Sequence, residues 1–159
     1  THCLSSAASD VYKRQAEHWG TDIMNNKDWY LGGKDTHFWA DLFVNALGRI
    51  NVKVAQPEEL IIAKQLRNSF LAMKVTYFNQ AYDFCKAQGV DFEEVRKVVT
   101  DDIRIGDSHS VVTADRGYGG HCFPKDTLAT IRSAQVSGAN MTLLEESDIY
   151  NRKVRNDKI

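Results

Sequence analysis

The ten residues GYGGHCFPKD, at positions 117–126, combine a glycine-rich loop with side chains that can do covalent and acid–base chemistry. Glycines let the main chain turn tightly and let a ligand approach the backbone. Cys122 follows the glycines, and the proline and the helical apolar spacing after it predict a helix just beyond. We therefore predict a ligand-facing loop that holds Cys122 just ahead of a helix N-terminus, where a thiolate nucleophile is favoured.

A second set of polar side chains lies on a long helix that the sequence predicts over residues 57–88. Pro57 and the two glutamates after it are typical of a helix start, and the glycine at position 89 is typical of a helix end. Lys64 and Asn68 are four residues apart, so their side chains project from the same face. Two interpretations stay open, a solvated outer face or a cleft lined by the apolar neighbours of this face.

The same helix carries a continuous apolar stripe, which predicts a packed face. About 31 residues at about 1.5 Å each give a length of about 46 Å, more than a small domain needs for its own core. We expect such a helix to bridge domains or subunits, and we assign Lys74 and Asn79 mainly structural roles. The stripe consists of Ile62, Leu66, Phe70, Met73, Tyr77, Ala81 and Phe84.

Shorter elements are expected on both sides of this helix. Capping boxes predict two helix starts, and Asp126 is expected to be the N-cap of a third helix. The span 100–124 is expected to be irregular. The expected elements are strands at 28–31 and 51–54, a helix at 36–48, a helix opened by Asp91 with Glu94, a helix over 126–138, and a helix opened by Thr142 with Glu145.

Composition limits the function classes. The chain has 159 residues, a formal net charge of -1 and no long run of like charges, which gives no electrostatic footprint for nucleic acid or for an anionic membrane. No apolar run is long enough to span a bilayer. The three cysteines are odd in number and far apart, which favours a reducing compartment and therefore a cytoplasmic protein.

A resemblance to a known family is carried by PEELIIAKQLRNSFLAMKVTYFNQAYDFCKAQGVDFEEV, DIRIGD, GYGGHCFPKDTLA and IYNRKVR, in that order. Together they resemble the central, dimerising domain of the UDP-glucose/GDP-mannose (nucleotide-sugar) 6-dehydrogenases, and the likeness is greatest to the members that act on UDP-glucose. The resemblance covers about residues 57–156. It implies an oxidoreductase of polysaccharide precursor biosynthesis that oxidises a C6 alcohol to a carboxylate, in two hydride transfers to NAD, through an aldehyde and a cysteine thioester.

The resemblance also implies catalytic roles. Cys122 corresponds to the nucleophile. Lys64 and Asn68 correspond to the lysine and asparagine that hold and polarise the oxygens at the reacting carbon and organise a water molecule. Asp126 corresponds to the acid that works with the lysine and the water as general base, a role compatible with helix capping.

Substrate and cofactor contacts follow from the same resemblance. Arg104 corresponds to the arginine that reaches across the dimer interface to the sugar nucleotide of the neighbouring subunit. The expected partners are therefore UDP-glucose and a second copy of the chain, with no nucleic acid, membrane or metal. Lys125 is expected to contact NAD. The loop residues expected to line the substrate are Gly117, Tyr118, Gly119 and Gly120.

Several positions depart from the family pattern. His121 stands where serine is more common, and Thr113 where some members have a lysine, which leaves GDP-mannose or a UDP-N-acetylhexosamine open as substrate. No GxGxxG sequence occurs in the chain, and Glu17 is a candidate for the family's glutamate with a spacing that looks one residue short. A helical dimerisation module without activity is therefore the alternative for the isolated chain.

Two other classes are disfavoured. A thiol hydrolase would need a histidine base beside Cys122, but the adjacent His121 is expected to point away along an extended backbone, and His109 has no supporting pattern. A zinc site built from these residues and Cys85 lacks ligand spacing.

The expected fold is mainly α. Residues 1–15, THCLSSAASDVYKRQ, lack the apolar segment of a signal peptide, and DVYKRQ resembles a translated sequencing adapter, so we interpret them as a non-native extension of a gene fragment. Residues 16–55 are expected to be an α/β remnant of a Rossmann domain. Residues 56–156 are expected to be a helical dimerisation and catalytic domain, similar to the C-terminal domain of 6-phosphogluconate dehydrogenase.

Overall fold

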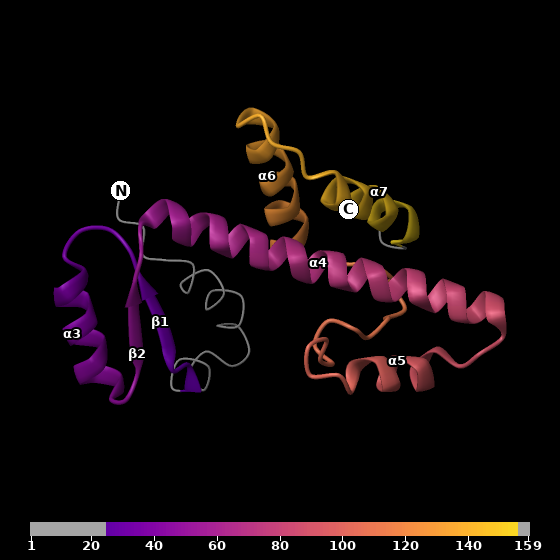
Figure 1. The fold of residues 1–159 in the computed structure, drawn as a ribbon, viewed down its shortest axis with the longest axis horizontal. Helices are drawn as coiled ribbons and strands as arrows, with labels where there is room; N and C mark the ends of the chain where they lie inside the picture. Colours follow the sequence, from indigo (N-terminus) through magenta and orange to yellow (C-terminus); the bar gives the residue numbers. More distant parts are fainter. Residues whose placement is uncertain (1–24, 156–159) are drawn as a thin grey trace. The chain divides into compact units, whose positions relative to one another are not determined.

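The computed structural model describes residues 25–155. Helices dominate it, as predicted, and the described residues divide into two compact units, one up to residue 64 and one from residue 65 (Figure 1). The proposed extension at 1–15 and Glu17 lie outside the described residues. Among the residues that the structure describes, no helix is long and apolar enough to cross a bilayer.

The first unit contains a small parallel sheet. Strand β1, Asp28–Leu31, pairs with strand β2, Asn51–Val54, and helix α3, Thr36–Leu47, connects them. A parallel pair needs such a crossover, because the chain must return to the same end of the sheet. Trp29 of β1 stacks on Phe43 of α3 with ring centroids 5.1 Å apart. Both short strands and the helix between them are therefore where the sequence predicted them, with α3 ending one residue early.

Helix α4, Pro57–Gln88, has the predicted bounds. Proline is tolerated in the first turn because its missing N–H would have no acceptor there. The Gln56 N–H donates to the Glu59 carboxylate at 3.0 Å, which is half of a capping box. Gly89 ends the helix with φ of +70°, a conformation that glycine adopts without strain.

The apolar stripe of α4 is not covered by the described residues. Phe70, Tyr77 and Phe84 are 61–65% exposed. The buried face of α4 consists mainly of small and polar side chains instead, among them Asn68, Ser69, Ala72, Thr76 and Asn79, together with Phe78 and Cys85. Small residues on this face let neighbouring helices approach closely, and its polar groups bond to them.

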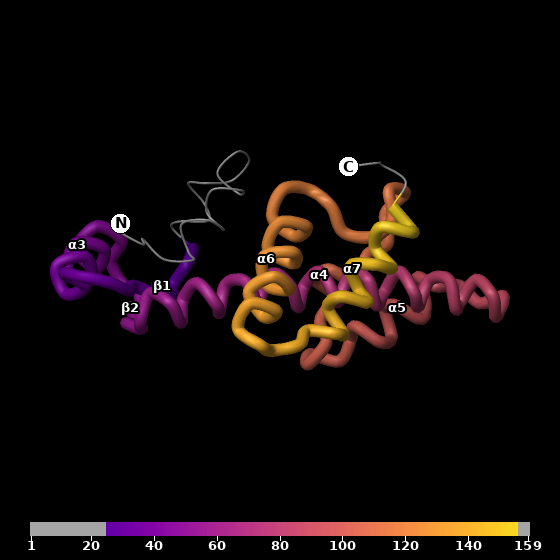
Figure 2. Tube along the Cα trace, turned by 90° about the horizontal axis from the view of Figure 1, so that it is seen from above, coloured from indigo at the N-terminus to yellow at the C-terminus, as the bar shows by residue number. Residues whose placement is uncertain are grey.

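The second unit packs on two sides of α4. Helices α6, Cys122–Val136, and α7, Thr142–Val154, lie on one side, and α5, Phe92–Thr100, lies on the other (Figures 1 and 2). Phe78 and Cys85 of α4 form the core with Phe92 of α5. The expected irregular span between α5 and α6 is present, and Lys74 supports it by donating to the carbonyls of Ile105 at 2.6 Å and Gly106 at 2.8 Å.

The three predicted caps have different outcomes. Asp91 caps α5 as expected, since its carboxylate accepts the N–H of Glu93 at 2.8 Å, but Glu94 pairs with Lys97 instead of closing a box. Helix α7 begins at Thr142, but Met141 holds the cap position and has no side-chain bond. The prediction that Asp126 caps α6 is wrong, because α6 begins four residues earlier, at Cys122.

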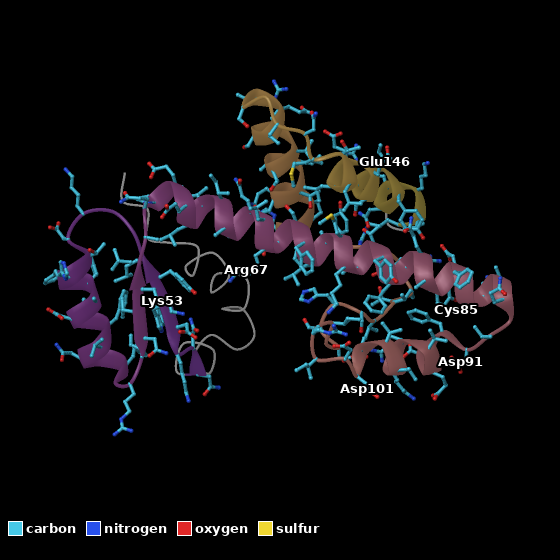
Figure 3. All side chains as sticks on the ribbon, in the orientation of Figure 1. Lys53, Arg67, Cys85, Asp91, Asp101 and Glu146 are labelled. Atoms are coloured by element: carbon cyan, nitrogen blue, oxygen red, sulfur yellow. The ribbon has the colours of Figure 1, made fainter. Side chains whose placement is uncertain are left out.

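Replacing the α5 cap gives a direct test of this assignment. Asp91→Ala removes an acceptor from an otherwise unbonded N–H and should lower the free energy of unfolding by about 1 kcal/mol. Asp101→Ala is the matched control, because Asp101 lies at the opposite end of α5 (Figure 3), where a carboxylate opposes the helix dipole. Denaturant unfolding should show a loss for the first variant and none for the second. Equal losses would contradict the cap.

Candidate functional site

Cys122 is the first residue of α6 and a half-buried free thiol. The sequence predicted that Cys122 would lie just ahead of the helix. The structure differs from this prediction because of how Pro124 is accommodated. Proline is accommodated in the first turn of α6, where its lack of an N–H has no cost, so the helix starts before it instead of after it. The thiol therefore lies at the positive end of the helix dipole.

Asp126 lies one turn further along α6 and is 3% exposed. The Asn68 side-chain amide of α4 donates to its Oδ2 at 2.6 Å. The Lys125 ammonium group pairs with its other oxygen, Oδ1. Both carboxylate oxygens are thus engaged, which is what a buried charge needs to be stable.

A pair of hydroxyl groups extends the contact between α4 and α6 that Asn68 and Asp126 begin; we call this line of polar contacts the seam. Ser69 Oγ and Thr130 Oγ1 are 3.0 Å apart, and both residues are buried. Each hydroxyl also lies within hydrogen-bond distance of a carbonyl one turn earlier in its own helix, Ser69 of Gln65 and Thr130 of Asp126, so one hydroxyl can donate to its carbonyl while the other donates across the pair. The contact between α4 and α6 is therefore polar and specific in register. This accounts for the polar face of α4, and it excludes the solvated outer face for Asn68.

Lys64 lies one helical turn before Asn68 on α4 and is half-buried. It is the last residue of the first unit, whereas Asn68 and Asp126 belong to the second. The structure thus brings Asn68, Asp126 and Lys125 into direct contact, with Cys122 one turn away. The catalytic roles of Lys64 and of these residues stay predictions.

The glycine-rich loop is held by α4. Asn79 Oδ1 accepts the N–H of Gly117 and the Nε–H of Arg116, both at 2.9 Å. Arg116 also bonds to the Asp83 carboxylate at 2.8 and 2.9 Å. Asn79 is 1% exposed, so its assigned structural role agrees with its contacts.

At two loop glycines, side chains of α7 and of the residue that follows it fill the space that a Cβ would occupy. A Cβ on Gly117, whose φ is +55°, would overlap the amide of Asn151. A Cβ on Gly119 would overlap the guanidinium group of Arg155. Packing inside the chain and the positive φ therefore favour glycine at position 117, whereas the long Arg155 side chain could move away from a Cβ at position 119. Gly120, with φ of +72°, is exposed.

Tyr118 is 2% exposed, and its hydroxyl group donates to Asp148 Oδ1 at 2.9 Å. Burial raises the pKa of this phenol above its ordinary value, and the charge of Asp148 acts in the same direction. Its side chain thus faces α7. Asp83, Arg116, Asp148 and Asn151 have no spacing signal in the sequence, so sequence reasoning gave them no role.

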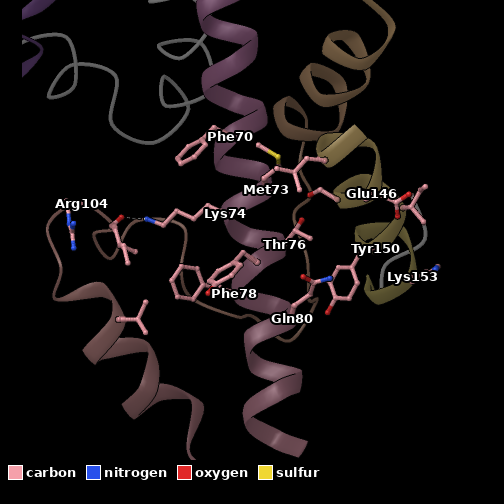
Figure 4. A pocket seen from close by; sticks show the side chains of 16 residues that line it. Phe70, Met73, Lys74, Thr76, Phe78, Gln80, Arg104, Glu146, Tyr150 and Lys153 are labelled. Atoms are coloured by element: carbon pink, nitrogen blue, oxygen red, sulfur yellow. Dashed lines mark hydrogen bonds between the residues drawn. The ribbon is translucent and has the colours of Figure 1, made fainter. Parts of the chain in front are cut away.

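Arg104 lies at the edge of a groove of about 670 Å³ on α4 (Figure 4). Its guanidinium group bonds to Asp102 two residues earlier, and its side chain is 85% exposed. The groove runs between this turn and α7, and Phe70, Met73, Tyr77 and Tyr150 contribute to its largely apolar lining. Arg104 does not contact Cys122, Asn68 or Asp126 among the interactions of the described residues, and its assigned role remains a prediction.

Residues 59–153 match the model of the UDP-glucose/GDP-mannose dehydrogenase family, central domain. The UDP-glucose 6-dehydrogenase of Pseudomonas aeruginosa is 40% identical over 95 residues, which cover 60% of this chain and 20% of that protein. UDP-glucose 6-dehydrogenase TuaD of Bacillus subtilis is 29% identical across 92% of this chain and 35% of its own length. The chain thus spans about a fifth of the first of these relatives and about a third of the second.

A solved structure is similar as well. A UDP-glucose dehydrogenase from the hyperthermophilic archaeon Pyrobaculum islandicum matches with a TM-score of 0.72 and 30% sequence identity. The match covers 83% of this chain and 30% of that one. Similar sequence and similar fold therefore point to the same family.

The bond between Asn68 and Asp126 can be tested by a double-mutant cycle. Asn68→Leu leaves a buried carboxylate oxygen without its donor and should lower the free energy of unfolding by about 2–3 kcal/mol. Adding Asp126→Leu removes the stranded charge, so the double variant should lose less than the sum of the single losses, by about 1 kcal/mol or more. Denaturant unfolding of the four proteins measures this. Additive losses would contradict the contact.

Proposed function

The chain belongs to the UDP-glucose/GDP-mannose dehydrogenase family, and on this premise we propose that it carries the catalytic cysteine of a UDP-glucose 6-dehydrogenase. The observation that supports this most is the position of Cys122. It begins α6 one turn before a buried carboxylate, Asp126, that Asn68 and Lys125 hold in place. The enzyme would oxidise the C6 alcohol of the sugar to a carboxylate.

The covalent step uses the thiol of Cys122. Its thiolate adds to the C6 aldehyde of the sugar and forms a thiohemiacetal, whose oxidation gives a thioester. Water then attacks the thioester carbon and releases the carboxylate and the thiol. Because the thiol lies at the N-terminus of α6, the positive end of the helix dipole would face the sulfur as it attacks and as it leaves.

Asp126 would assist hydrolysis of the thioester by accepting a proton from the attacking water. Asn68 fixes the orientation of the carboxylate through the bond to Oδ2, and Lys125 balances its charge. Lys64, one turn before Asn68, would place an ammonium group beside the oxygen that becomes negative as the thiolate adds. These contacts would hold the Asp126 carboxylate in the orientation that a general base needs.

NAD is the cofactor that the family resemblance implies, and it would accept the hydrides from C6. Lys125 is the candidate contact in this chain, because its side chain is 54% exposed and so open to an anionic group beside Asp126. The chain's sequence contains no GxGxxG phosphate-binding turn. The chain's own contribution is therefore to bind the sugar, form the bond to sulfur and move the protons.

We also propose that the chain forms a homodimer through α4. Phe70, Tyr77 and Leu143 are 61–76% exposed, and all three line the groove on α4 with other apolar residues. A monomer seldom leaves such a patch in water. A second copy fits best, because a two-fold interface lets the exposed stripe of each α4 enter the groove of the other. Arg104, at the groove edge, would then face the second copy.

This dimer supports the second candidate function, a dimerisation module that has no activity as an isolated chain. It also leaves the sugar nucleotide open, since GDP-mannose or a UDP-N-acetylhexosamine would use the same C6 chemistry. NADH formation with a panel of sugar nucleotides separates these alternatives.

Grafting residues 57–155 into the P. aeruginosa UDP-glucose 6-dehydrogenase tests the catalytic proposal. The hybrid should reduce NAD with UDP-glucose, and Cys122→Ser should lower formation of the uronic acid by about a thousandfold or more, because an alkoxide leaves far less readily than a thiolate. Absorbance at 340 nm and chromatography of the product measure both. Cys85→Ala is the control, since Cys85 lies in the core and not at the site.

Lys64→Ala in the same hybrid should lower turnover with little loss of stability. A folded hybrid without activity, or normal uronic acid release by Cys122→Ser, would contradict the proposed function. A Lys64→Ala variant that melts early but keeps its specific activity would show a structural role for Lys64.

Self-association has its own test. Tyr77→Asp places a charge in the centre of the exposed stripe and should raise the dimer Kd by about thirtyfold, which is about 2 kcal/mol. Val136→Asp is the matched control, because Val136 is 74% exposed on α6 and does not line the groove. Sedimentation velocity measures both. A parent chain that stays monomeric at micromolar concentration would contradict the interface.

A further inference from the structure

The main chain of Tyr118 is bonded at both of its polar groups by one side chain of α7. Asn151 Oδ1 accepts the Tyr118 N–H at 2.7 Å, and Asn151 Nδ2 donates to the Tyr118 carbonyl at 3.0 Å. Asn151 is 3% exposed and Tyr118 2% exposed. A single amide thus satisfies a buried donor and a buried acceptor four residues before Cys122.

Two further contacts hold the same residue and its neighbour. The Tyr118 hydroxyl group donates to Asp148, which lies three residues before Asn151 on α7, and Arg152 pairs with Asp148 at 2.5 Å. On the other side, Asn79 of α4 accepts the Gly117 N–H. The loop is therefore held from two helices, and the absence of a Cβ at Gly117 is what lets the amide of Asn151 approach.

We propose that Asn151 is a positioning residue that fixes the main chain at Tyr118 and thereby sets where α6 begins and where the thiol of Cys122 lies. We call the two hydrogen bonds between the Asn151 amide and the Tyr118 main chain the clamp. The consequence for catalysis rests on the proposed function, but the existence of the clamp does not. Only three residues separate Tyr118 from Cys122, so the clamp leaves the first turn of α6 little freedom. Asn151 touches no reacting atom and acts through the loop.

Asn151→Asp is the informative variant, because it keeps the size of the side chain and the acceptor for Tyr118 N–H. At pH 7.5 the introduced carboxylate has no donor for the Tyr118 carbonyl and repels it. Burial raises the pKa of such a carboxyl group, and we expect it to be protonated at pH 5 and able to donate again. The defect should therefore appear at neutral pH and disappear on acidification, which a merely space-filling role would not produce.

Hydrogen–deuterium exchange of the 159-residue chain measures the clamp. Relative to the parent, Asn151→Asp should speed exchange in the peptide covering 116–121 about fivefold or more at pH 7.5, the loss of roughly one hydrogen bond. At pH 5 the ratio should fall to within about twofold, whereas Asn151→Leu should show a raised ratio at both pH values. The charged groups around these bonds are the same in parent and variant, namely Asp83, Arg116, Asp148, Arg152 and Arg155. The ratio of the variant's exchange rate to the parent's therefore cancels any effect of their titration.

Alkylation by iodoacetamide gives a second measurement. In Asn151→Asp at pH 7.5, the rate at Cys122 should change about threefold or more, while Cys85 in the core should keep its slow rate. Asn140→Asp makes the same chemical change at an exposed position just before α7 and should leave both cysteines and the 116–121 peptide unchanged.

Three results would overturn the proposal. One is fast hydrogen–deuterium exchange of the Tyr118 amide in the parent chain, a measurement that does not depend on any variant being folded. Another is an Asn151→Asp defect of equal size at both pH values. The third is faster alkylation of Cys85 together with Cys122, which would mean general unfolding. If the clamp is confirmed and the hybrid enzyme is inactive, the proposed function fails and the clamp stands.

Discussion

Asp126 lies almost completely out of water, and an ionised carboxylate in such a place is stable only when hydrogen bonds and an opposite charge replace its hydration. Asn68 of α4 and Lys125 of α6 provide these contacts. The bond from Asn68 fixes the register of α6 against α4, and the hydroxyl pair of Ser69 and Thr130 continues the same seam one turn further. The position of Cys122 follows from this register, because it starts the helix that Asp126 anchors.

The second constraint acts on the other side of Cys122. The loop 116–120 passes between α4 and α7, where Asn79 and Asn151 bond to its main chain. The first turn of α6 is thus anchored on its N-terminal side by Tyr118 and on its C-terminal side by Asp126. A thiol at a helix N-terminus is reactive through its charge environment, and two anchors within four residues on either side make its position reproducible.

The sequence signals that succeeded were local. Pro57 and Gly89 mark the ends of α4, and a short apolar-aromatic stretch marks strand β1, so these bounds were predictable. The start of α6 was not, because Pro124 is compatible with a helix that begins before it as well as after it. The choice is made by Asn68, which lies 58 positions away and draws Asp126 into the interior. Likewise, Gly117 and Gly119 were expected to admit a ligand, and the side chains that occupy their open faces come from distant positions 151 and 155.

The central claim is that the sulfur of Cys122 bonds to the reacting carbon. Acid quenching of turnover in the hybrid enzyme, followed by digestion and mass spectrometry, tests it most directly. The Asp126→Asn variant should be used, because loss of the base is expected to slow hydrolysis of the thioester. We predict that the peptide containing Cys122 gains the mass of the nucleotide-linked uronyl group and that the peptide containing Cys85 does not. Continued formation of uronic acid with an unmodified Cys122 peptide would contradict the account.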